Sequence, residues 1–258
     1  MPQALVRILV ALSLCLASPA FADHDHGAHV SHDGGAAIEA KVSLVAARYS
    51  TTSYLGDYQG ITPALRYSRG IASVGANASL YRLTKNGEDY FGFGDVVVDG
   101  QVQLAGGHPA STGVALAVSL PSGSQRDGLG MGHVMLMPSA WGVYMFDRVT
   151  LIGSVGYGRA LGGDAHAHHS TGGAIVDPMN MSELTWSAQA DVSLARVLTA
   201  GVRAMGGIPV GEDGENRVVG GVRVEWREGR VTTSAELQGG FDGDPFEVRG
   251  VLATALRL

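Results

Sequence analysis

Two short tracts of histidines carry the side chains of this chain that are best suited to chemistry. The sequence contains nine histidines, and seven of them lie in these tracts. The tracts consist of His24, His26, His29 and His32 near the start of the chain, and of His166, His168 and His169 farther along. Imidazoles beside carboxylates are good ligands for Zn, Cu or Ni ions, and His-rich tracts are compositional candidates for metal binding. The seven residues therefore predict metal capture; the alternative is that both tracts are solvated polar segments without a ligand.

Other imidazoles and carboxylates could in principle serve hydrolysis. The candidates are Asp127, His133, Asp164, His166 and Asp177. Their order along the chain matches no recognisable triad, and the sequence contains no G-x-S-x-G nucleophile motif. We therefore predict that the protein is not an enzyme and requires no cofactor, with a hydrolase as the least favoured alternative.

Residues 1–22 have the pattern of a secretory signal peptide. Arg7 supplies a positive charge, residues 8–17 are apolar, and Ala20-Phe21-Ala22 matches the A-x-A cleavage pattern. Cleavage would leave Asp23 first, and its free amine could bind copper together with His24. Cleavage would also remove Cys15, the only cysteine, so neither disulfides nor thiolate metal sites are expected in the mature chain.

The composition of the exported chain leaves two structural classes open. A formal net charge of −6 argues against nucleic-acid binding. After the signal, no apolar stretch reaches the ~20 residues that a transmembrane helix needs. An exported chain of this kind is expected to be either a soluble domain or a membrane-spanning β-barrel, and the strand pattern decides between them.

Alternation of apolar and polar residues is the main secondary-structure signal. Between Glu183 and Leu194 every second residue is apolar, and residues 217–227 and 231–239 repeat the pattern. Side chains alternate faces along a strand, so each segment has one apolar and one polar face. The apolar faces contain many Ala and Gly beside Val and Leu, which suits lipid contact better than the core of a soluble sandwich.

The lengths and connections of these segments favour the membrane. Tilted strands that cross a bilayer need ~9–11 residues, which is the length of the clearest segments. The predicted strands are 37–50, 59–68, 71–84, 94–105, 112–121, 134–146, 148–160, 182–195, 197–209, 216–227, 230–241 and 245–258. Their connections are either short turns or longer loops, and outer-membrane barrels place short turns in the periplasm and long loops outside. The long connections are 84–94, 121–133, 161–181 and 209–215.

The predicted fold is therefore all-β: a transmembrane antiparallel up-and-down barrel of about twelve strands over residues 37–258. An even number of strands places both termini in the periplasm. The first histidine tract would then be periplasmic and the second extracellular, so the two tracts could not share one metal ion.

Aromatic residues gather near the strand ends, as the aromatic girdles of membrane barrels do. The predicted outer girdle consists of Tyr49, Tyr157, Trp186, Phe241 and Phe246. The predicted inner girdle consists of Tyr67, Tyr144, Phe146 and Trp226.

The polar faces of the strands would line a lumen. The predicted lumen-lining residues are Arg203, Arg223, Glu225, Glu236, Glu247 and Arg249. Charges of both signs predict little ion selectivity. Eight strands are just filled by side chains and sixteen leave a channel, so twelve predict a narrow or partly plugged pore. The flexible His-rich segment 23–36 could lie beneath or inside that pore.

Two features of the sequence resemble known outer-membrane barrels. In the last predicted strand, every second residue from Phe246 to Leu258 lies on the same face. This pattern resembles the C-terminal strand that such barrels present to their insertion machinery. Leu258 stands where those strands usually end in an aromatic residue. Gly94-Asp95, residues 119–123 (SLPSG) and residues 127–133 (DGLGMGH) resemble the family of phenol-degradation meta-pathway (MetA-pathway) transporters. This resemblance covers residues 94 to about 158, and it implies a barrel that passes small organic molecules.

The sequence thus predicts a monomeric barrel in the outer membrane, in contact with lipid, that gives small solutes a passive route. Metal ions could be linked to this route through the His tracts. One alternative is a non-conducting barrel whose tail and loop bind metal or a partner, and the second is a hydrolase active at the outer rim.

Overall fold

The computed structural model describes residues 35–51, 54–162, 175–176, 178–211, 214–243 and 246–258. The predicted signal peptide and both histidine tracts lie outside these ranges, as do Asp164 and Asp177. No helix in the described ranges is long and apolar enough to cross a membrane.

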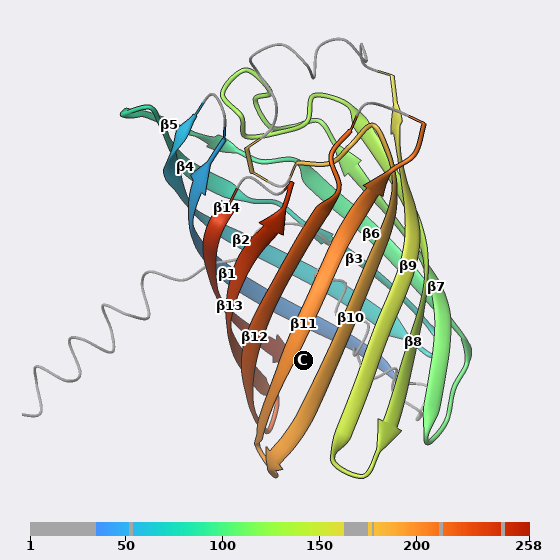
Figure 1. The fold of residues 1–258 in the computed structure, drawn as a ribbon. Coiled ribbons are helices and arrows are strands. Elements are labelled where there is room, and N and C mark those ends of the chain that lie inside the picture. The colour runs from blue at the N-terminus through green and yellow to red at the C-terminus, as the bar shows by residue number, and fades with distance from the viewer. Residues whose placement is uncertain (1–34, 52–53, 163–174, 177, 212–213, 244–245) are drawn as a thin grey trace, which may run out of the picture.

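Within the described residues, fourteen strands pair into one continuous antiparallel sheet (Figure 1). They are β1 (Ala36–Ser50), β2 (Leu55–Arg69), β3 (Ala72–Asn77), β4 (Leu80–Lys85), β5 (Glu88–Phe93), β6 (Val96–Ala105), β7 (Ala110–Leu120), β8 (Val134–Phe146), β9 (Val149–Leu161), β10 (Ser182–Ala195), β11 (Leu198–Pro209), β12 (Arg217–Glu228), β13 (Val231–Asp242) and β14 (Phe246–Arg257).

The fourteen strands correspond to twelve strands of the barrel wall, because two wall strands are interrupted. β3 and β4 both pair with β2 and are two halves of one strand, broken at residues 78–79. β5 pairs with β4 and β6 pairs with β3, so these form the next strand, broken at residues 94–95. β1 and β14 pair from Glu39 opposite Arg257 to Tyr49 opposite Phe246 and close the sheet. In the described part of the chain, the predicted twelve-stranded antiparallel barrel is confirmed.

The predicted long connection 84–94 is wrong, because these residues form a hairpin tip. β4 and β5 are joined by Asn86 and Gly87, which have φ values of 53° and 88°. Two successive positive φ angles make a tight two-residue turn, for which Asn-Gly is a favoured pair. Asn86 Oδ1 also accepts a hydrogen bond from the Leu55 amide at 3.0 Å. This contact lies beside the start of β2, which begins four residues before the predicted position.

The outward side chains form an apolar belt around the barrel. Alternate residues of the wall strands are exposed and apolar, including Leu65, Leu116, Val155, Val202, Val222 and Leu237. Their neighbours in sequence face inward and are mostly shielded. A continuous exposed apolar surface around the whole barrel would be unfavourable to hydrate in water, so the belt is the face that contacts lipid.

Aromatic side chains border this belt at both ends. At one end Tyr67, Tyr144, Phe146 and Trp226 are exposed, as predicted for the inner girdle. At the other end Phe241 is exposed together with Phe91 and Phe93, which were predicted to lie in a loop. The prediction is wrong for Tyr49 and Phe246, which are fully shielded inside the barrel. Tyr49 shares the inward face of Val45 and Ala47, and the irregular register between β1 and β14 turns Phe246 inward opposite it.

The two ends of the barrel differ in their connections. Both the start of β1 and the end of β14 lie at the short-turn end, where the Leu258 amide donates to the Ile38 carbonyl at 2.8 Å. Segment 121–133 and the described residues of segment 162–181 belong to the other end, at the top of Figure 1, which we call the long-loop end.

Candidate functional site: a polar lumen closed by two loops

The inner face of the barrel carries ion pairs that reach across an intervening strand. Arg66 of β2 donates to Asp99 of β6 at 2.7 Å and to the hydroxyl of Ser73 of β3 at 3.0 Å. The carboxylate and the guanidinium are both well shielded. An ion pair in such a position stabilises the charges only when further hydrogen bonds satisfy them, and Ser73 supplies one.

A second group of inward charges lies on β10 and β12. Arg223 donates to Asp191 at 3.0 Å and to Glu225 at 2.8 Å, and Arg227 donates to the other oxygen of Glu225 at 2.9 Å. Gln189 also donates to Asp191 at 2.7 Å. These side chains form a chain of alternating charge along the lumen wall, so their charges largely cancel.

A third group lies on β13 and β14. Arg249 donates to Gln238, whose amide in turn donates to Glu236, both at 2.5 Å. The Arg249 guanidinium lies 4.0 Å from the centre of the Phe246 ring. Cations over aromatic faces are attracted by the ring, so this contact joins the polar wall to the apolar region above it.

The predicted lumen-lining residues do not all share one face. Arg203, Arg223, Glu225, Glu236 and Arg249 occupy inward positions of β11 to β14. Glu247 lies apart from them: its side chain is 51% exposed and pairs with the outward Arg48 at 3.2 Å. Arg48 pairs with Val248 and Tyr49 with Phe246, so Glu247 is an extra residue in β14, and the alternation is broken there.

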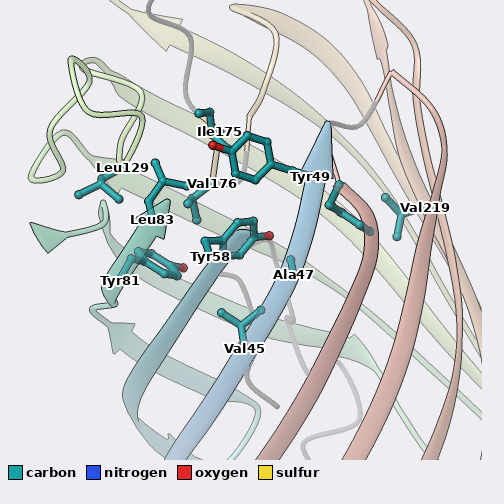
Figure 2. Close-up of a cluster of buried hydrophobic side chains, with 11 residues drawn as sticks. Val45, Ala47, Tyr49, Tyr58, Tyr81, Leu83, Leu129, Ile175, Val176 and Val219 are labelled. Carbon is teal, nitrogen blue, oxygen red and sulfur yellow. The ribbon is translucent and has the colours of Figure 1, made fainter. Parts of the chain in front are cut away.

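Above the polar wall, a buried apolar cluster lies inside the barrel, and we call this cluster the plug. Its members are Val45, Ala47, Tyr49, Tyr58, Tyr81, Leu83, Leu129, Ile175, Val176, Val219 and Phe246. Most come from the barrel wall, but Leu129 comes from segment 121–133 and Ile175 and Val176 come from segment 162–181. Figure 2 shows the three loop residues meeting the wall side chains inside the barrel. At the long-loop end, these loop residues therefore pack inside the barrel against β1, β2, β4, β12 and β14.

Hydrogen bonds hold the two loops of the plug together and to the wall. The amides of Ile175 and Val176 donate to the Gly128 carbonyl at 3.0 and 3.2 Å. Asp95, in the break between β5 and β6, accepts from the amides of Gly123 at 2.9 Å and Met131 at 2.8 Å. A carboxylate that binds backbone amides fixes loop position strongly, because these bonds are charge-assisted. The plug is therefore anchored on one side by Asp95.

Of the residues that the sequence suggested for hydrolysis, only Asp127 and His133 lie in the described part of the chain. His133 is buried beside the start of β8, and Asp127 is partly exposed in the neighbouring turn. Among the described residues, no group of three or more His, Cys, Asp or Glu side chains is placed to hold a metal ion.

The plug was not predicted from the sequence. Its only signal was the presence of apolar residues inside polar, glycine-rich loops, namely Leu129 and the pair Ile175-Val176. Three lumen residues, Arg66, Asp99 and Asp191, were likewise not predicted, although they alternate in their strands in the same way as the residues that were.

Comparison with known proteins places the fold. No family model and no curated protein matches the chain. Among solved structures, the COG4313 outer membrane channel from Pseudomonas putida F1 has a TM-score of 0.69 at 9% identity, over 90% of this chain and 98% of that one. The translocator domain of autotransporter NalP from Neisseria meningitidis has a TM-score of 0.55 at 12% identity, over 100% of this chain and 98% of that one. The NanC porin has a TM-score of 0.51 at 8% identity, over 86% of this chain and 100% of that one.

At these identities the likeness concerns the fold. The chain has the fold of the bacterial outer-membrane β-barrels, with a closed wall, an apolar belt and a polar interior.

Proposed function

We propose that this protein is a monomeric outer-membrane channel through which small organic solutes diffuse passively. The observation that carries the proposal is the lumen itself, which has a polar wall of paired charges and an apolar plug made partly of loop residues. A wall of this kind offers hydrogen bonds without a strong net field, so neutral or weakly charged solutes would be favoured. The likeness to outer membrane channels and porins supports the same interpretation.

The position of the plug implies how such a channel works. Leu129, Ile175 and Val176 belong to connections and not to the wall, so their displacement leaves the strand pairing intact. Solutes that enter from the long-loop end would first meet Tyr49, Tyr58 and Tyr81, whose rings suit aromatic or partly apolar molecules. This agrees with the expectation from the meta-pathway transporter resemblance, which also stays part of the proposal.

Conductance of the purified barrel in planar bilayers tests the proposal. We expect Leu129→Ser to raise the conductance and the uptake of small aromatic solutes into liposomes several-fold, because a hydroxyl in the plug weakens its apolar contacts. Val210→Ser is the matched control, since Val210 is an exposed apolar residue of another loop at the same end. Heat-modifiable gel migration verifies that each variant is folded.

If Leu129→Ser and a variant lacking residues 124–130 both fold and conduct nothing, the channel proposal is wrong. The barrel would then belong to the non-conducting class, and its loops would carry the function.

Metal capture by the histidine tracts is a separate part of the proposal. Its support is compositional: His24, His26, His29 and His32, and His166, His168 and His169, are spaced closely enough to share Zn, Cu or Ni ions. Equilibrium dialysis with each ion should show binding that alanine substitution of each tract removes separately. Equal binding by the wild-type protein and a variant lacking both tracts would exclude a role for them.

A further inference from the structure

Three buried methionines pack together inside the barrel, and none of them has a role in the proposed channel function. Met131 of segment 121–133, Met135 of β8 and Met179 of segment 162–181 form their own buried cluster, with Met137 and Ala160 packed against it. Met131 and Met135 are four residues apart, and the fold brings Met179 to them from a distant part of the chain. We call Met131, Met135 and Met179 the methionine cluster.

A glycine makes room for two of these side chains. A Cβ atom at Gly158 of β9 would lie 2.9 Å from Met179 Cε and 3.3 Å from Met135 Cε. Both thioether methyl groups therefore converge on the same small area of the wall. The side chain of Glu183 borders this area, since its Cγ would lie 3.6 Å from the same point.

The composition of the cluster differs from that of the plug beside it. The plug uses Leu, Ile, Val and Tyr for an apolar contact between loop and wall, whereas the methionine cluster uses thioethers for a contact of the same kind. Methionine can serve simply as a flexible filler of irregular gaps. It is also the neutral side chain whose soft sulfur binds Cu(I), in contrast to the imidazoles and carboxylates that bind harder ions.

We propose that Met131, Met135 and Met179 form a binding site for a soft monovalent cation, Cu(I) or its analogue Ag(I). Three thioethers supply soft sulfur donors without charge, so the ion keeps its positive charge. The proposed site uses none of the histidines of the two tracts as ligands and does not depend on the barrel being a channel.

The site also joins the two loops of the plug. Met131 lies two residues after Leu129, and Met179 lies three residues after Val176. A cation bound by Met131 and Met179 together would cross-link segments 121–133 and 162–181. Binding should therefore slow the exchange of the Gly128, Ile175 and Val176 amides with solvent, because opening these loops would require breaking metal–sulfur contacts.

The direct test uses the full chain in detergent micelles, with its methionine methyl groups labelled with ¹³C. On titration with Ag(I), which needs no reductant, we expect the resonances of Met131, Met135 and Met179 to shift together and saturate. Met145 and Met205 lie outside the cluster and serve as internal controls whose resonances should stay in place. Single Met→Leu variants assign each resonance.

Leucine substitution separates metal binding from packing. The triple variant Met131→Leu, Met135→Leu and Met179→Leu conserves side-chain volume, and such swaps are usually tolerated. We expect it to fold, as judged by heat-modifiable migration, and to bind one Ag(I) fewer per chain than a Met145→Leu, Met205→Leu control. If the three resonances do not move in the wild-type protein, or move no more than those of Met145 and Met205, the cluster is a packing feature only. That result would leave the channel proposal untouched, because conductance is measured without metal.

Discussion

The carboxylate of Glu183 and the guanidinium of Arg217 form an ion pair across a strand that lies between them. Glu183 is in β10 and Arg217 in β12, and the distance from Arg217 Nη2 to Glu183 Oε1 is 2.5 Å. The pair passes over Gly207 of β11, where a Cβ atom would lie 2.7 Å from Glu183 Cδ. Asn180 adds two donors to the other carboxylate oxygen, at 3.1 and 2.8 Å. Glycine at this position of β11 is therefore what allows the two charges to meet.

Removing the Glu183 carboxylate should destabilise the barrel strongly. The side chain of Glu183 is 0% exposed and that of Arg217 is 10% exposed. Glu183→Ala leaves a buried guanidinium without its carboxylate, which typically costs about 3–5 kcal/mol. Urea unfolding in lipid vesicles measures the loss. Glu247→Ala is the control, because its pair with Arg48 is half-exposed and such pairs contribute at most about 1 kcal/mol. Equal losses for the two variants would show that the Glu183 pair is hydrated in the folded protein.

The ring of Tyr81 lies between two glycines, and filling either space should strain the plug. A Cβ atom at Gly60 would lie 2.3 Å from Tyr81 Cδ1, and one at Gly94 would lie 2.6 Å from Cε2. The ring also meets Tyr58 edge-on, with the ring centres 6.1 Å apart. The Tyr81 ring cannot move away from a new Cβ atom without losing its contact with Tyr58. Gly60→Ala should therefore lower the free energy of unfolding by about 1–3 kcal/mol through overpacking.

Gly100→Ala is the matched control for Gly60→Ala, since a Cβ atom there would make only an ordinary contact at 3.7 Å. Both variants place alanine inside a wall strand, so a difference in their unfolding midpoints reports on Tyr81. If Gly60→Ala is as stable as the control, the ring has another position available and the plug is less rigid than its packing suggests.

Asp95 should control the mobility of the plug loop. Its two oxygens accept hydrogen bonds from the amides of Gly123 and Met131. Asp95→Ala removes both, and hydrogen bonds to charged groups contribute about 1.5–3 kcal/mol each. We expect amide hydrogen exchange to accelerate across residues 123–131 while exchange in β7 and β8 stays unchanged. Asp127→Ala removes a carboxylate from the same loop and should leave exchange at 123–131 unaltered; a similar acceleration in both variants would contradict the anchoring role of Asp95.

The membrane wall was predictable because lipid contact imposes a simple rule on the sequence. A strand between lipid and a polar lumen must alternate, and the run 183–194 does so throughout, which is why the limits of β10 were predicted to the residue. Prediction failed where that rule does not apply. Near Asn86 and Gly87 the strands extend beyond the apolar belt, with water outside the barrel and the apolar plug inside it. Alternation of apolar and polar residues along the sequence therefore no longer distinguishes the outward face from the inward face.

The candidate site was harder to predict for the same reason. Tyr49 lies at the correct end of its strand but on the inner face, because the plug makes the inside of the barrel apolar at that height. Glu247 follows the alternation in the sequence, yet the irregular register between Arg48 and Tyr49 removes it from the lumen face. Contacts such as Leu129 with the wall depend on how a loop folds back, which no local pattern encodes.

The two faces of β12 and β13 should respond oppositely to the same added charge. Val222 faces outward in the apolar belt and is 56% exposed, whereas Ser234 faces inward and pairs in register with Glu225. Arginine on the lipid face near the middle of the bilayer costs about 2–4 kcal/mol, so Val222→Arg should lower the free energy of unfolding in lipid vesicles by that amount. Ser234→Arg adds the same side chain beside the carboxylates of Glu225 and Glu236 and should cost little. If the two variants are destabilised equally, the outward face is not in contact with lipid, and the barrel would have to be reinterpreted as a structure that is wet on both sides.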